Sequence, residues 1–348
     1  GAFDESEYPM VDPTVDMAEQ CLEYLNDFLR EFEFKSEADR SAALCAILTA
    51  AVRASLPTAP AFNITATGPG SGKSYLADVI TPFAGPDEPY RVSFPERHDE
   101  AGKLIITVLR EQPPAVLFDD MQGNWKSLGP LNRALSSSTT TERLLGSNRT
   151  ATVSTRMLFL GTGNHVEPER DMRRRVVTIR LAPKSENPAL RSFRGSPAAD
   201  LKKDRAEPVM CALTIIRAFQ AAGEPVANVK SIGSFEEWSR HCRLPLIWLG
   251  LPDPAQSLID QVSKDPEQER LAEFLDVWWR KFGSQSVTVR KLLAKALQDD
   301  DLTEAIEELP VMEGRYINRG RLGWFLSKRL GTRAGGLRLE PGESSERN

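Results

Sequence analysis

The sequence predicts an α/β fold built on a parallel sheet, with helical regions before and after it. Short β-type runs recur between residues 61 and 181, helical patterns separate them, and a glycine-rich loop directly follows the first run. Strands that alternate with helices are joined by crossovers, and this connection makes neighbouring strands parallel. These observations together favour an α/β layer over an all-helical or all-β fold.

Two helices are expected before the sheet. Residues 17–32 repeat apolar side chains at helical spacing, and residues 36–56 open with Ser36 as a cap and Asp39 three positions later. Residues 1–50 are acidic, with twelve Asp or Glu and three Lys or Arg, a net charge of −9. Since the whole chain carries −5, the remaining 298 residues carry +4. This uneven distribution of charge, with an acidic start and a basic remainder, indicates an interaction surface in the later part of the chain. A merely solvated face is the alternative.

Five short runs account for the expected sheet: residues 61–67, 90–94, 115–120, 156–164 and 175–181. Helices are expected between them, beginning near residues 73 and 99. After Pro183 the pattern becomes helical, and a charged stretch at 263–270 resembles a linker. Beyond the linker, short helices followed by a turn and a strand suggest a winged helix-turn-helix.

The glycine-rich loop has the sequence TGPGSGKS at residues 67–74, close to the phosphate-loop pattern G-x-x-x-x-G-K-[ST]. Thr67 replaces the first glycine of the pattern. The residues that would surround a triphosphate are Gly68, Pro69, Gly70, Ser71, Gly72, Lys73 and Ser74. Lys73 can reach the β- and γ-phosphates, and the Ser74 hydroxyl can bind Mg²⁺. The alternative is a glycine-rich turn that contains Gly-Lys-Ser by chance.

Polar residues end two later strands. Asp119 and Asp120 follow four apolar residues, and Asn164 ends the run 156–164. Ligands of parallel α/β sheets bind at the carboxyl ends of the strands. We therefore expect Asp119 to hold magnesium, Asp120 to polarise an attacking water, and Asn164 to orient that water.

Arg174 and Arg175 lie ten and eleven residues beyond Asn164, too far for easy use at the nucleotide of the same subunit. Such an arginine can stabilise transition-state charge from a neighbouring subunit. The alternative is that Arg173, Arg174 and Arg175 cap a helix or pair with Asp171 and Glu169.

The order of these motifs resembles the AAA+ ATPases of the superfamily 3 helicase type. More narrowly, it resembles the primase-associated replicative helicases of bacteriophages and mobile genetic elements. The matching stretches are residues 59–80, 114–123, 142–181, 235–254 and 319–339. Two departures are Thr67, at the first loop glycine, and His165, where relatives often have a second asparagine.

The resemblance implies ATP and Mg²⁺ as cofactors, a hexameric ring that translocates along single-stranded or forked DNA, and an arginine finger at Arg174 or Arg175. It also raises a primase domain or protein as a partner. We expect an acidic helical N-terminal region (1–60), an AAA+ P-loop ATPase core (61–185), a helical lid or connector (186–265), a winged-helix-like basic domain (266–340) and a disordered tail (341–348). No apolar run is long enough to span a bilayer, so we expect a cytoplasmic protein.

Two segments are candidate DNA contacts. Residues 142–155 predict a hairpin that would project into the pore, with Arg143 and Arg149 as phosphate contacts; solvated arginines are the alternative. In the basic helix near residues 319–330, the candidates are Arg319, Arg321, Lys328 and Arg329. That helix could instead bury Leu322, Phe325 and Leu326 and use its basic face for solubility. The six tryptophans are interpreted as core residues, since most lie at helical spacing with leucines.

Two other functions fit the same motifs. A loader or protein-remodelling ATPase would use the winged domain to dock a partner. A binding-only scaffold would grip nucleotide without turnover.

Overall fold

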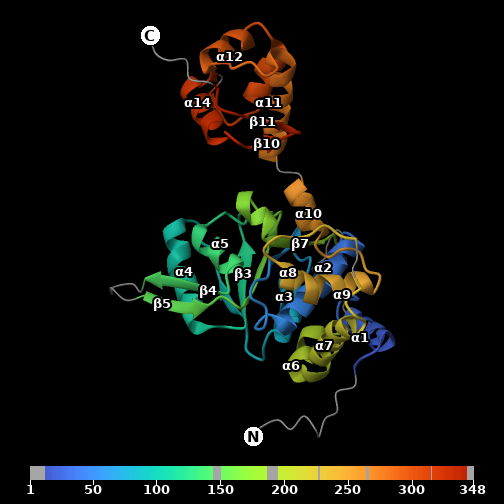
Figure 1. Ribbon diagram of the computed structural model, residues 1–348. Coiled ribbons are helices and arrows are strands. Elements are labelled where there is room, and N and C mark those ends of the chain that lie inside the picture. The colour runs from blue at the N-terminus through green and yellow to red at the C-terminus, as the bar shows by residue number, and fades with distance from the viewer. Residues whose placement is uncertain are drawn as a thin grey trace. The chain divides into compact units, whose positions relative to one another are not determined.

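The computed structural model describes residues 12–143, 150–185, 195–225, 228–263, 266–314 and 316–342 (Figure 1). The chain divides into two compact units, Gly1–Val262 and Ser263–Asn348. Each unit is described by itself. The tail expected to be disordered lies outside the described residues from position 343 onward.

The first unit contains a five-stranded sheet in the order β2-β3-β6-β1-β7, and every neighbouring pair is parallel. The strands are β1 (Ala61–Ala66), β2 (Tyr90–Val92), β3 (Ala115–Met121), β6 (Leu158–Asn164) and β7 (Val176–Leu181). The predicted α/β class with a parallel sheet is confirmed. Because the strands are parallel, the carboxyl ends of β1, β3 and β6 meet at one edge.

Apolar side chains cover both faces of this sheet. On one face, Phe62, Leu117 and Leu160 share a core with helices α2 (Glu37–Val52), α3 (Lys73–Ile80) and α7 (Ala206–Ala221). On the other face, Phe118 and Phe159 pack with α4 (His98–Glu111) and α5 (Gly129–Ser136). The near-continuous apolar runs in the sequence reflect burial on both faces, as in other parallel sheets.

The N-terminal residues belong to the same unit. Helix α1 (Val15–Asp27) packs against α7, and the chain after α1 meets the edge strand β7 through Lys35 N–H to Arg180 O, 2.9 Å, and Ala182 N–H to Glu33 O, 2.7 Å. Ser36 caps α2 by accepting from Asp39 N–H, as predicted. The remaining helices of the unit are α6 (Pro197–Lys203), α8 (Glu236–Trp238), α9 (Leu244–Trp248) and α10 (Gln256–Ser263).

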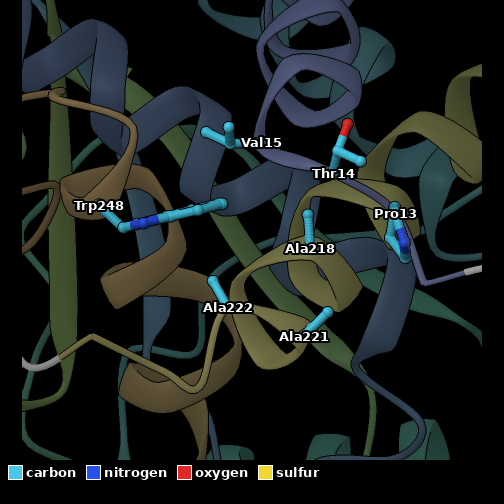
Figure 2. Close-up of a pocket in the computed structure, with 7 residues that line it drawn as sticks. All are labelled: Pro13, Thr14, Val15, Ala218, Ala221, Ala222 and Trp248. Carbon is cyan, nitrogen blue, oxygen red and sulfur yellow. The ribbon is translucent and has the colours of Figure 1, made fainter.

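A cavity of about 400 Å³ lies beside α1 and α7 (Figure 2). Its lining carries no charged side chain and consists of Pro13, Thr14, Val15, Ala218, Ala221, Ala222 and Trp248. None of these residues belongs to the glycine-rich loop or to the carboxyl ends of the strands.

The predicted hairpin forms from antiparallel strands β4 (Thr139–Arg143) and β5 (Thr150–Ser154). It extends away from the sheet (Figure 1). It starts at Thr139, three residues earlier than expected, and Thr141 and Thr152 hydroxyls lie 2.7 Å apart across it. The turn predicted at residues 146–148 and Arg149 lie outside the described residues.

The second unit has its own core, centred on Phe274, Leu292, Ile306 and Leu322. Its elements are α11 (Pro266–Phe282), α12 (Val289–Ala296), α13 (Asp300–Glu307), β8 (Met312–Glu313), β9 (Tyr316–Ile317), α14 (Arg319–Lys328), β10 (Arg333–Ala334) and β11 (Leu337–Arg338). The short strands form two antiparallel pairs, β8 with β9 and β10 with β11.

The interpretation of all six tryptophans as core residues is wrong for two of them. Trp125 and Trp238 are fully buried, but Trp279 is 52% exposed and Trp324 is 65% exposed. A helix that turns Leu322, Phe325 and Leu326 inward leaves position 324 on its outer side. Helical spacing to leucines therefore did not separate the inward from the outward tryptophans. Across the part of the chain that is described, no helix is both long and apolar enough to cross a membrane.

Candidate active site

The glycine-rich loop joins the end of β1 to the start of α3. Gly70 has φ +70° and Gly72 has φ +87°, backbone conformations that residues other than glycine rarely adopt. Gly72 is the N-cap of α3, and no side chain caps the helix. The first N–H groups of α3 therefore have no acceptor in the helix, and the helix dipole favours an anion at this end. This local structure suits a phosphate group.

Lys73 links the loop to the neighbouring strand. Its Nζ donates to Gly68 O at 3.1 Å, Ser71 Oγ at 2.9 Å and Asn164 Oδ1 at 2.7 Å. Asn164 reaches the loop because β6 pairs with β1 in a register that sets it beside Ala66. Burial lowers the pKa of Lys73, and the nearby charge of Asp120 acts in the opposite direction. The ammonium is thus held in the loop by neutral oxygens that a phosphate could replace.

Ser74 and Asp119 are in direct contact, with Ser74 Oγ donating to Asp119 Oδ1 at 2.9 Å. Thr162 Oγ1 donates to the same oxygen at 2.6 Å, and Arg91 Nη1 donates to Oδ2 at 2.8 Å. Burial alone would raise the pKa of Asp119, but these hydrogen bonds and the Arg91 charge outweigh it and keep the pKa below its usual range. Asp119 is therefore held as a carboxylate. A hydroxyl and a carboxylate are hard oxygen ligands, so this pair fits Mg²⁺.

Asp120 has an unusual backbone. The pairing of β3 with β6 shifts between Phe118 and Met121, and Asp120 has φ +50°. Its N–H donates to Thr162 Oγ1 at 3.1 Å and lies 3.2 Å from Asp119 Oδ1. Consecutive residues of a regular strand point to opposite faces, so the irregularity changes where the two carboxylates point. The Asp120 residue is exposed, which leaves its carboxylate accessible to water.

Two members of the site, Thr162 and Arg91, were not predicted from the sequence. Thr162 lies two residues before Asn164 and hence on the same face of β6, so the period of two could have identified it. Arg91 lies on β2 and also forms an ion pair with Asp78 of α3. No motif in the sequence marks Arg91, because its partners come from two other elements.

A buried polar network supports the end of β6. Asn63, in the middle of β1, donates to Val166 O at 2.7 Å and accepts from Trp125 Nε1 at 3.1 Å. His165 has φ +53° and donates its N–H to Ala66 O at 3.0 Å. These bonds fix the chain that immediately follows Asn164.

Arg174 and Arg175 lie in different environments. Arg174, at the end of the 3₁₀ turn Arg170–Arg174, has a 53% exposed side chain paired with Asp171. Arg175 is buried: its Nε donates to Ser136 Oγ at 2.8 Å and its Nη1 to Asp171 O at 2.9 Å. The pairing with Asp171 that was the alternative interpretation is present for both. Neither arginine contacts the Lys73 and Asp119 cluster in these interactions.

The candidate DNA contacts are only partly described. Arg143 is the last residue of β4, and the structure does not describe its side chain. In the second unit, Arg321 Nη1 donates to Met312 O at 2.7 Å, and Arg329 pairs with Glu267 and lies over the Phe325 ring. Arg319 and Lys328 are exposed. Leu322, Phe325 and Leu326 are buried beneath them, as the alternative interpretation expected.

No protein-family model matches the sequence, and no curated protein matches it. Among solved structures, the chain is similar to the ligand-free C-terminal region of NrS-1, with 12% identity, a TM-score of 0.35 and 86% of this chain covered. This chain spans 62% of the length of that NrS-1 region. It is also similar to the JCV helicase with a bound small molecule, with 14% identity, a TM-score of 0.25, and 70% of this chain and 69% of that chain covered. At these TM-scores neither similarity identifies a function, so the function is inferred from the site.

Proposed function

We propose that this chain is an ATP-hydrolysing DNA helicase or translocase that works as a ring. One observation carries the hydrolase part of the proposal: consecutive residues of α3 hydrogen-bond to two strands at the carboxyl edge of the sheet, Lys73 to Asn164 of β6 and Ser74 to Asp119 of β3. Open helix N–H groups, an ammonium, a metal-type oxygen pair and a water-orienting amide are the groups that phosphoryl transfer needs.

Each residue has a role in this proposal. The loop N–H groups and Lys73 hold the β- and γ-phosphates, and Ser74 with Asp119 holds Mg²⁺. A bound magnesium ion supplies positive charge that neutralises developing charge on the phosphate oxygens. Asp120 accepts hydrogen bonds from the attacking water and polarises it, and Asn164 orients that water toward the γ-phosphate.

The two arginines support the proposal of a ring. Arg174 is the arginine finger in this proposal, since its side chain is exposed at the surface and its ion pair with Asp171 is partly exposed. Arg175 is assigned a structural role, because its guanidinium is buried within its own subunit. A finger that acts on the neighbouring subunit requires a second copy beside each nucleotide site, and we propose that six copies close into a ring.

DNA is the proposed polymer substrate. The hairpin β4–β5 would extend into the pore, where Arg143 and Arg149 would grip the phosphate backbone without reading sequence. The second unit, with its order of helices and final antiparallel strand pair, is proposed as a winged-helix-like module. A primase domain or protein is the proposed partner in replication.

The test is phosphate release from ATP and Mg²⁺ by the full chain, with and without single-stranded DNA, together with its mass with and without an ATP analogue. We expect hydrolysis that DNA stimulates and a ring-sized particle with nucleotide. A monomer under every condition, with activity unchanged by dilution, would contradict the ring. Nucleotide binding without phosphate release would indicate a scaffold, and hydrolysis without strand separation on a forked duplex would favour a loader.

A further inference from the structure

We propose that the outer face of α14 binds single-stranded DNA, with Trp324 stacking on an unpaired base. This α14 face consists of the exposed residues Gly320, Arg321, Trp324, Ser327 and Lys328. The inference rests on the proposed function in one respect, that the chain acts on DNA. It goes beyond that function in naming the base-contacting residue and the strand state that this module prefers.

Trp324 is not needed for the core of the second unit. Leu322, Phe325 and Leu326 are 0%, 3% and 8% exposed and form the inner side of α14, whereas Trp324 is 65% exposed. An exposed indole leaves a large apolar surface in water, and removing that surface from water is favourable. An aromatic ring at the centre of a helix's outer face is therefore available for a partner.

The surroundings of the indole are basic. Arg321 and Lys328 lie three residues before and four residues after Trp324, one helical turn to each side, and α14 contains no acidic residue. Lys328 Nζ lies 6.0 Å from the centroid of the Trp324 ring, within the range of a cation–π contact. Arg321 is held at the other end by its bond to Met312 O. In a DNA strand phosphates alternate with bases, so the two cations could bind phosphates while the ring between them stacks on a base.

The position four residues before Trp324 on the helix carries no side chain. Helical side chains lean toward the preceding turn, and the residue four positions before Trp324 is Gly320. A Cβ placed on Gly320 would come within 4 Å only of Asn318 Oδ1. No side chain at position 320 therefore separates the indole from an approaching base.

Single-stranded DNA fits this face better than duplex DNA. In a duplex each base already stacks on its neighbours, so an indole gains a base surface only where bases are unpaired. Aromatic stacking is tolerant of sequence, because every base has a π-face, and this tolerance suits a motor that must move along any strand.

The second unit offers a matched control. Trp279 on α11 is also exposed, at 52%, but its surroundings are of mixed charge, since Asp276 lies three residues before it and pairs with Arg280. If exposure of an indole alone determined binding, Trp279 and Trp324 would contribute equally.

The experiment measures binding of a fluorescent oligothymidylate to the full chain by anisotropy, at low and at physiological salt. We expect Trp324→Ala to weaken binding about 10-fold. Trp324→Phe should keep most of the affinity, Trp324→Leu should lose it like alanine, and Trp279→Ala should leave it unchanged. A hairpin duplex of the same length should bind weakly and be insensitive to Trp324→Ala.

Several results would overturn the inference: unchanged affinity in Trp324→Ala, equal losses in Trp324→Ala and Trp279→Ala, or a duplex that binds as well as the single strand. If Trp324→Leu binds the oligothymidylate as tightly as wild type, the face is instead an apolar docking surface for a protein. Urea unfolding midpoints should agree among all variants, because both tryptophans are exposed. ATP hydrolysis without DNA should be the same in wild type and Trp324→Ala. If wild type hydrolyses ATP and Trp324→Ala binds DNA normally, only this inference is rejected. If wild type does not hydrolyse ATP, the proposed function is rejected.

Discussion

The carboxyl edge of the sheet and the outer face of α14 are both polar surfaces, but they are built in opposite ways. At the sheet edge the side chains are bonded to one another: Lys73 to Asn164, and Ser74 and Thr162 to Asp119. On the α14 face, Trp324 and Lys328 are exposed, and the Lys328 ammonium lies 6.0 Å from the centroid of the Trp324 ring. The first arrangement fixes positions before a ligand arrives, and the second leaves surface free for one.

Phosphate chemistry and DNA binding place different requirements on a surface. Chemistry on a phosphate needs groups held in place within a fraction of an ångström, which hydrogen bonds between different elements provide. Gripping a strand needs accessible charge and flat apolar surface, which a single helix can present. Substitutions at the sheet edge should therefore change turnover or stability, and substitutions on the α14 face should change DNA affinity alone.

The largest effect is expected for Lys73→Ala. Loss of the ammonium removes positive charge from the phosphates, and we expect ATP hydrolysis to fall about 1000-fold, on the order of 4 kcal/mol of transition-state stabilisation. Phosphate release at saturating ATP measures this loss. Lys103→Ala, an exposed lysine on α4, is the control and should hydrolyse ATP normally. Oligothymidylate binding without nucleotide should be the same in both variants, and a parallel loss of DNA affinity would mean that the two surfaces are not separate.

The contrast also explains what the sequence could predict. Five strands in one parallel sheet, the loop, Asp119 and Asn164 were predictable, because motif spacing and parallel pairing together bring these residues to one edge. Arg91 was not predictable, since its partners Asp78 and Asp119 come from different elements. The exposure of Trp324 was missed for a related reason: helical periodicity marks an apolar side of a helix but not which residues the rest of the unit covers.

The next largest effect is expected for Arg175→Ala. Its guanidinium is buried and donates to Ser136 Oγ and Asp171 O, so removing it takes a donor from both oxygens and leaves a cavity, and we expect a loss of about 3 kcal/mol in the free energy of unfolding. Arg174→Ala should leave stability within about 0.5 kcal/mol, because its side chain is exposed. Urea unfolding measures both.

The same two variants test the arginine finger. Arg174→Ala should lower ATP hydrolysis in the assembled protein and inhibit wild type when mixed with it. If Arg174→Ala is fully active, or if Arg175→Ala is stable but inactive, the assignment of roles to the two arginines is reversed or wrong.

A smaller effect is expected for Thr162→Val, which keeps the shape of the side chain and removes the hydroxyl. Asp119 then loses one donor and Asp120 N–H loses one acceptor. We expect ATP hydrolysis to fall about 10-fold through a looser Asp119, the equivalent of one hydrogen bond to a charged group. Rescue by Thr162→Ser would assign the effect to the hydroxyl, whereas equal loss in the serine variant would assign it to packing in β6.

The smallest effect concerns pH and distinguishes the turn before β7 from the α14 face. Burial alone would raise the pKa of Asp171. Hydrogen bonds from Arg174 and Arg175 outweigh this effect, so the pKa in the folded protein lies below the usual value. Ionised Asp171 therefore stabilises the fold at pH values above the ordinary aspartate pKa, about 4, and this contribution is lost as the pH falls through the folded pKa. Asp171→Asn should cost about 1 kcal/mol at pH 7 and progressively less toward pH 3, as urea unfolding at both values would measure. The α14 helix carries no carboxylate, so Trp324→Ala should show no such dependence. A cost of Asp171→Asn that is the same at pH 3 and pH 7 would mean that Asp171 acts by hydrogen bonding alone, and that its charge contributes little to the turn before β7.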